Sequence, residues 1–174
     1  AEKRKKEDER IAKLPWENQM GDDLLIWNLP KPIPADAWKI DKATRELTGK
    51  CGAAYKSNPF GAIIGVGKPG WKDYIVQFRY KIVKGGFHLG VRASPNGSSV
   101  DALLPTSADG QWHTVELSVR GTGSDTELTI TEGGASKPCP GKDPDAWGAG
   151  GVAFVLEPQS ECVFADLKVK VINK

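Results

Sequence analysis

The sequence predicts an all-β protein folded as a two-sheet antiparallel sandwich. Several short runs alternate apolar and polar residues with a period of two, which is typical of half-buried strands. The 174 residues include 20 Gly and 12 Pro, so turns are frequent and long helices are disfavoured. Strands that follow one another through turns, with no helical stretch between them, favour an antiparallel sandwich over a parallel sheet.

Length and charge narrow the classes of partner. The chain is long enough for one domain plus a short extension, with a core that needs no metal or disulfide. The net charge is +2, and beyond the N-terminus the basic residues form no single stripe, so we expect no nucleic-acid partner. No apolar run approaches about 20 residues, so no membrane span is expected.

The chain divides into three predicted segments. They are a charged N-terminal arm or short helix (1–15), an irregular Pro-rich lead-in (16–37) and the sandwich domain (38–174). The arm carries too few apolar residues to dock firmly by itself. It is therefore either a solvated extension or a tether to a protein partner. Within the lead-in, an edge strand is possible around 24–27.

Ten runs are expected to be strands: 38–40, 46–49, 62–66, 74–83, 87–94, 100–104, 112–120, 127–131, 151–157 and 162–172. The first two form a predicted hairpin. Runs 74–83 and 87–94, joined at Gly85-Gly86, form the clearest predicted hairpin. Segment 133–150 is predicted to be a loop. In the last run, Val163, Ala165, Leu167, Val169 and Val171 are expected on one face, away from Asp166, Lys168 and Lys170.

Three cysteines, Cys51, Cys139 and Cys162, lack the spacing of a zinc site or a CxxC pair. A Cys139–Cys162 disulfide and three separate thiols are equally compatible with this spacing. Ala1 fits either a mature N-terminus after cleavage of an export signal or an excised domain. We therefore expect an extracytoplasmic location: periplasmic, secreted or on the cell surface.

Three motifs resemble a known family. The segment 110–121 (GQWHTVELSVRG) is similar to the Trp-led strand of laminin-G-like domains. Segments 150–157 (GGVAFVLE) and 163–169 (VFADLKV) resemble their closing strand pair. Segment 73–80 (DYIVQFRY), followed by Gly-Val-Arg at 90–92, is similar to a hairpin of bacterial 3-keto-disaccharide hydrolase domains.

Over about 38–172 the chain thus resembles concanavalin A-like (laminin-G-like) jelly-roll domains, in particular the 3-keto-disaccharide hydrolase type. The resemblance implies a jelly-roll sandwich and a carbohydrate ligand. It also implies hydrolysis, but the acidic–Gln pair typical of those hydrolases is missing from 98–104, which favours binding over catalysis.

Four polar residues are the predicted ligand-binding set: Gln77, Arg79, His88 and Arg92. Period-two alternation would place them on one face of the predicted hairpin. Sugars are bound by such planar donors and acceptors together with an aromatic face, which Trp71 and Trp147 could supply. The alternative is that the polar residues are only a solvated sheet face, with Arg79 paired to Glu116 or Glu157, and that the tryptophans only fill the core.

No catalytic set is evident. Glycoside hydrolysis ordinarily needs two neighbouring carboxylates, and the candidates Asp101, Glu116, Glu157 and Asp166 form no paired motif. His113 falls on the apolar face of its strand and is expected to be a hydrogen-bonded core residue. We expect no cofactor. Calcium is conceivable at Asp22-Asp23 or at 143–145, but neither segment has alternating ligand positions.

The leading hypothesis is a non-catalytic carbohydrate-binding or adhesion-type module of an extracytoplasmic bacterial protein. A glycoside hydrolase acting on disaccharides such as 3-keto-glycosides is the second hypothesis. A structural or protein-interaction module that uses residues 1–15 is the third.

Overall fold

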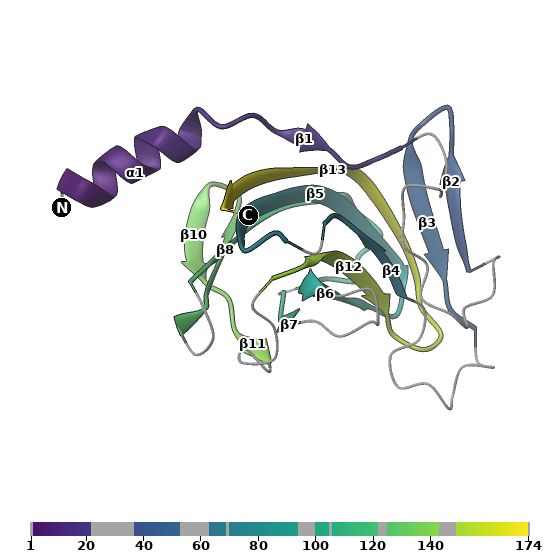
Figure 1. Cartoon of the computed structure of the whole chain (residues 1–174). Coiled ribbons are helices and arrows are strands. Elements are labelled where there is room, and N and C mark those ends of the chain that lie inside the picture. The colour runs from purple at the N-terminus through teal and green to yellow at the C-terminus, as the bar shows by residue number, and fades with distance from the viewer. Residues whose placement is uncertain are drawn as a thin grey trace.

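In the part of the chain that the structure describes, two antiparallel sheets pack face to face, and one helix, α1 (Glu2–Ala12), lies at the N-terminus (Figure 1). The structure, a computed structural model, describes residues 2–21, 37–52, 63–68, 70–93, 100–104, 106–121, 125–142 and 149–173. The predicted all-β jelly-roll sandwich with a charged N-terminal arm or short helix is confirmed. The possible strand at 24–27 lies outside the described residues.

The larger sheet has eight strands. They are β1 (Glu17–Asn18), β2 (Trp38–Asp41), β3 (Glu46–Lys50), β5 (Asp73–Lys84), β8 (His113–Arg120), β9 (Glu127–Glu132), β10 (Ala135–Pro138) and β13 (Glu161–Asn173). Their order is β10-β9-β8-β5-β13-β3-β2, and β1 also pairs with β13. The predicted hairpin of β2 and β3 is confirmed, with Trp38 opposite Gly49.

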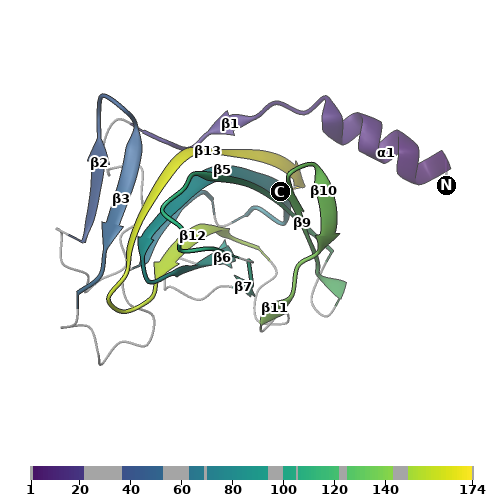
Figure 2. The same cartoon turned by 180° about the vertical axis from the view of Figure 1, so that it is seen from behind.

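The smaller sheet has five strands, in the order β11-β7-β6-β12-β4. They are β4 (Ile63–Val66), β6 (Phe87–Ala93), β7 (Val100–Ala102), β11 (Gly141–Lys142) and β12 (Gly151–Leu156). In Figure 1, β13 and β5 arch over β12 and β6, and Figure 2 shows the same arch from behind. The larger sheet therefore wraps the smaller one, and its outer face is convex.

The predicted hairpin of β5 with β6 is wrong. β5 pairs with β8 and β13 in the larger sheet, whereas β6 pairs with β7 and β12 in the smaller one. The Gly85-Gly86 turn carries the chain from one sheet to the other. Gly85 has φ 70°, and a side chain there would collide with Ser160, whose hydroxyl accepts a hydrogen bond from the Gly86 N–H (2.9 Å). The two strands consequently do not share an outer face.

Aromatic rings from both sheets meet in the core. Phe154 of β12 stacks on Phe164 of β13 with ring centroids 4.0 Å apart, and Phe78 of β5 meets Phe154 edge-on at 5.1 Å. All three side chains are fully buried. Burial of each such side chain stabilises the fold by roughly 1.5–3 kcal/mol, so these contacts hold the sheets together.

A bulge changes the side-chain alternation in β13. Ala165 pairs with Arg79 and Lys168 with Gln77, so Asp166 and Leu167 together face Phe78. Asp166 has φ 54°. Cys162 and Phe164 before the bulge, and Leu167 and Val169 after it, belong to the core cluster. The prediction that Val163 and Ala165 share a face with Leu167 and Val169 is therefore wrong, because the extra residue inverts the pattern.

The N-terminal arm docks through few contacts. Ile11 of α1 is buried, and the ammonium of Lys170 donates a hydrogen bond to the carbonyl of Ala12 (3.2 Å), where the helix dipole favours a cation. The Trp16 ring lies 4.9 Å from Lys168 Nζ and 4.8 Å from Lys170 Nζ. Among the described residues, no helix is long and apolar enough to cross a membrane.

All three cysteines are buried free thiols. Of the two alternatives left open by their spacing, three separate thiols is therefore confirmed and the Cys139–Cys162 disulfide is wrong. Burial, and to a lesser degree the charges of Glu157 and Glu161, raises the pKa of Cys162 to about 12. Burial also raises the pKa of Cys139. The charges acting on Cys162 are anionic, the opposite of the electropositive surroundings of a reactive cysteine.

Candidate functional site

A pocket of about 480 Å³ opens on the outer face of the larger sheet. Its floor comes from β5 and β8, and its walls come from the segment around β1, the β2–β3 turn and the bulge of β13. The lining residues are Trp16, Asn18, Met20, Arg45, Gln77, Phe78, Arg79, Thr114, Asp166 and Lys168. The size lies within the range of about 300–1,000 Å³ that is usual for small-molecule sites.

The floor presents planar polar groups. Alternation in β5 buries Phe78 and turns Gln77 and Arg79 outward. The Gln77 amide donates a hydrogen bond to Glu116 Oε2 of β8 (3.0 Å). The guanidinium of Arg79 lies 4.8 Å from the centroid of the Trp112 ring. Both polar groups are thus held in place by their neighbours while they remain accessible to the pocket.

Asp166 reaches the pocket because of the β13 bulge. Its positive φ turns the carboxylate onto the outer face, where Oδ2 accepts a hydrogen bond from Arg79 Nε at 2.6 Å. A non-Gly residue with positive φ costs free energy, and such strain is concentrated at functional positions. Bulges likewise re-aim side chains next to binding sites. Asp166 and Arg79 are therefore oriented as a unit.

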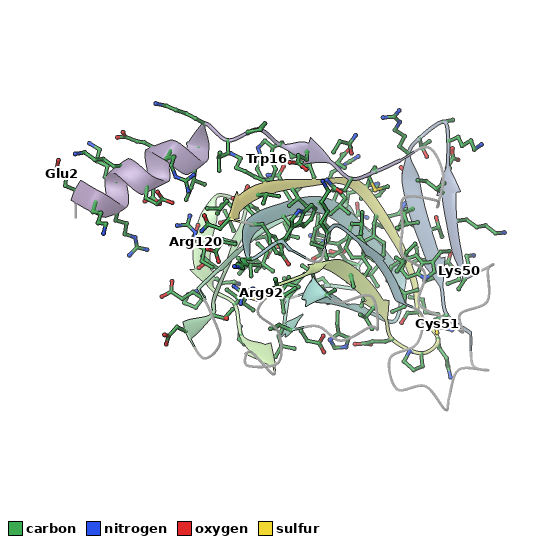
Figure 3. The ribbon with its side chains drawn as sticks, viewed as in Figure 1. Glu2, Trp16, Lys50, Cys51, Arg92 and Arg120 are labelled. Atoms are coloured by element: carbon green, nitrogen blue, oxygen red, sulfur yellow. The ribbon has the colours of Figure 1, made fainter. Side chains whose placement is uncertain are left out.

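The wall is built by residues that follow the arm. The Gln19 N–H donates to the Leu167 carbonyl (2.8 Å), and Asn18 Oδ1 accepts from the Met20 N–H (2.9 Å). The first bond and the strand pairing of Asn18 with Lys168 fix β1 along the second half of β13, and the second bond turns the segment after β1. Figure 3 shows Trp16 on the outer side of β13, the side on which the pocket opens.

This combination suits saccharide recognition. Amide, guanidinium and carboxylate groups donate to and accept from sugar hydroxyls, and an indole ring packs against the apolar face of a pyranose. The Gln77 carbonyl oxygen accepts and the Thr114 hydroxyl both donates and accepts. Gln77 and Arg79 of β5, Thr114 of β8 and Asp166 of β13 present their groups from strands, which hold them more rigidly than loops, and Trp16 immediately precedes β1.

The predicted site residues separate in the structure. Gln77 and Arg79 line the pocket. His88 lies on the outer face of the smaller sheet, where its Nε2 is 3.1 Å from Glu157 Oε1. Trp71 is 2% exposed and packs on Tyr74 (5.9 Å between ring centroids). Trp147 lies outside the described residues.

Arg92, expected to face a ligand, is fully buried. A bulge opposite Gly151 and φ 51° turn it into the end of the sandwich. Its guanidinium donates to the carbonyls of Lys72 (3.1 Å) and Gly121, and to the Thr126 hydroxyl (2.8 Å). Figure 3 shows it inside the arch. Arg92 is therefore a structural cation in this conformation, with no access to a ligand.

Three of the four candidate carboxylates for hydrolysis have polar partners within the fold. Glu116 accepts from Gln77, Asp166 from Arg79, and Glu157 lies beside His88. His113 stacks on Tyr80 (5.2 Å between ring centroids), and its Nε2 lies 2.9 Å from Asp109 Oδ1, so the expected hydrogen bond is confirmed. The expected place in the core is wrong, because the side chain is 25% exposed and does not belong to the core cluster.

The described residues contain no cluster of three or more His, Cys, Asp or Glu side chains that could hold a metal ion. Both candidate calcium segments, 22–23 and 143–145, lie outside the described residues.

Of the residues that line the pocket, the sequence predicted Gln77 and Arg79 as ligand-binding and missed the others, among them Trp16, Asn18, Lys168 and the orientation of Asp166. The pairing of a two-residue strand with β13 leaves no periodic signal. The contact of Trp112 with Arg79 could have been predicted from strand alternation. Trp112 precedes Thr114 by two residues and so falls on the same outward face, and Thr114 lies opposite Arg79 of β5.

By sequence, the chain matches no family model and has no significant match among curated proteins. Solved structures share its fold. A candidate glycosyl hydrolase of Parabacteroides distasonis is 13% identical, with a TM-score of 0.59 over 95% of this chain and 97% of that one. The GH43B protein of the Bacteroides ovatus xyloglucan PUL is 15% identical, with a TM-score of 0.54 over 90% of this chain and 39% of that one.

An endo-1,3-β-glucanase of Streptomyces sioyaensis is 8% identical, with a TM-score of 0.50 over 91% of this chain and 96% of that one. At these identities the likeness establishes the fold alone. The chain is a two-sheet jelly-roll sandwich of the kind found in glycosyl hydrolase-like proteins.

Proposed function

We propose that the protein is a non-catalytic carbohydrate-binding module that holds a saccharide in the pocket of the larger sheet. The observation that carries this proposal is the convergence of Gln77, Arg79 and Asp166 beside Trp16 in one open pocket. The carbohydrate-related names of the solved structures with this fold support the ligand class. An extracytoplasmic location and a bacterial source are part of the same proposal.

Glycan-array screening followed by isothermal titration calorimetry tests the proposal. We expect saccharide binding by the wild-type protein and about tenfold weaker binding by Gln77→Ala, since one lost hydrogen bond to a ligand is worth roughly 1–1.5 kcal/mol. Gln111→Ala is the matched control, because Gln111 is an exposed amide that does not line the pocket.

Three results would contradict the proposal. If no saccharide binds, the module is not a carbohydrate-binding one. If Gln77→Ala binds as tightly as wild type, the ligand lies elsewhere. If the protein releases reducing sugar from bound oligosaccharides or 3-keto-disaccharides, it is a hydrolase and not a non-catalytic binding module.

A further inference from the structure

We propose that the pocket takes an acidic saccharide, with the anionic group, a carboxylate or a sulfate ester, bound at the ammonium of Lys168. This inference rests on the proposed function of the pocket as a saccharide site. Three lining side chains, Arg45, Arg79 and Lys168, are cationic, and Asp166 alone is anionic. The lining therefore favours a ligand that brings negative charge.

Lys168 forms no ion pair with a carboxylate in the part of the chain that the structure describes. The Asp166 carboxylate is bound by Arg79 at 2.6 Å, and the ion pairs of the described residues do not include Lys168. The Lys168 ammonium instead lies 4.9 Å from the centroid of the Trp16 ring. That contact leaves the ammonium free to donate hydrogen bonds to an anion.

A second cation strengthens the local potential. Lys170 is 7% exposed, and its ammonium lies 4.8 Å from the same Trp16 ring. Its hydrogen-bond partner is the neutral carbonyl of Ala12, so its charge is not cancelled there. Two ammonium groups thus share one indole ring at a half-buried position. Charges in such places are screened by salt less than charges on an open surface.

Backbone pairing fixes where Lys168 presents its ammonium. Lys168 lies opposite Gln77 of β5 on one side and Asn18 of β1 on the other. An anionic group at Lys168 would therefore have the Gln77 amide and the Asn18 side chain close by. Such neighbours bind hydroxyl groups, which points to a charged group carried on a sugar ring.

Calorimetry with three matched probes tests this inference on the full chain. The probes are an oligogalacturonate, the same oligosaccharide with its carboxylates methyl-esterified, and a sulfated neutral galactan oligosaccharide. The variants are Lys168→Gln, Lys168→Arg and the control Lys137→Gln, which removes one exposed lysine on β10.

We expect wild type to bind the oligogalacturonate at least tenfold more tightly than its ester, with the preference reduced as salt rises. Lys168→Gln should abolish this preference, Lys168→Arg should retain it and Lys137→Gln should leave it unchanged. Tight binding of the sulfated galactan, lost in Lys168→Gln, would support the inference with sulfate as the anion. Equal binding of acid and ester, with no Lys168-dependent binding of the sulfated galactan, overturns the inference alone. No binding of any saccharide, acidic or neutral, overturns the proposed function with it.

Discussion

Arg79 Nε donates to Asp166 Oδ2 at 2.6 Å, across the junction between β5 and the bulge of β13. The two side chains are 41% and 66% exposed. An ion pair this exposed contributes at most about 1 kcal/mol to stability. Its consequence is geometric, because the pair and the Trp112 ring together fix one orientation of the guanidinium.

Arg79→Lys should weaken saccharide binding about tenfold while the melting temperature stays nearly unchanged. Lysine keeps the charge but loses the planar fork and its stacking on Trp112. Calorimetry and thermal unfolding measure the two effects. Arg120→Lys is the control, because Arg120 is a half-buried arginine of β8 that lies outside the pocket and pairs with Asp8 of α1 (3.8 Å). Equal affinities of the two variants would show that the Arg79 geometry does not matter for binding.

Trp16→Ala should release the arm from the larger sheet. The Trp16 ring contacts two ammonium groups, and its loss should raise the rate of trypsin cleavage after the exposed Lys13 by up to about fivefold. Trp112→Ala also removes a ring with two cations over it but lies away from the arm. The same cleavage rate in both variants would mean that Trp16 does not anchor the arm.

Arg92→Lys should lower the free energy of unfolding by about 3 kcal/mol or more, because buried polar groups at the end of the sandwich would lose their hydrogen-bond donors. Lysine cannot reach the Lys72, Gly121 and Thr126 oxygens at once. Urea unfolding monitored by circular dichroism measures the loss. A loss below 1 kcal/mol would show that the guanidinium contacts contribute little.

Stability should fall at alkaline pH through Cys162. Its pKa is raised to about 12 in the folded protein, so the folded state keeps a proton that the unfolded chain loses above about pH 9. The contribution is complete below that pH and is lost progressively up to about pH 12. The free energy of unfolding, measured by urea denaturation between pH 8 and 11, should fall more steeply for wild type than for Cys162→Ala.

Burial also raises the pKa of Tyr74. That residue is present in both proteins, so the difference between their slopes isolates Cys162. Parallel curves for wild type and Cys162→Ala would contradict the prediction.

The sequence predicts most strands because period-two alternation is strong in runs such as β5 and β8, whose buried and outward residues fall as expected. Alternation also identified Gln77 and Arg79 as outward-facing. It could not show which strands pair, because a Gly-Gly turn serves equally for a hairpin and for a crossing between sheets. The β5–β6 hairpin prediction failed for that reason.

Bulges account for most of the remaining errors. One extra residue is inserted at Arg92 and another at Asp166, and each has a positive φ. Each insertion changes which face of the sheet the neighbouring side chains occupy. Neither Arg nor Asp is a residue type that predicts a bulge. Arg92 therefore moved from the expected ligand face into the interior. The strands β10 and β11 were missed because their short, exposed or Gly-containing runs carry no apolar alternation.

NMR titration of the labelled protein with the best saccharide from the array distinguishes the two outer faces of the sandwich. We expect chemical-shift changes at the indole N–H of Trp16 and at the amides of Gln77 and Lys168, which border the pocket of the larger sheet. Changes confined to His88 and its neighbours on the smaller sheet, with the Trp16 and Gln77 signals unmoved, would place the ligand on the other face and contradict the proposed site.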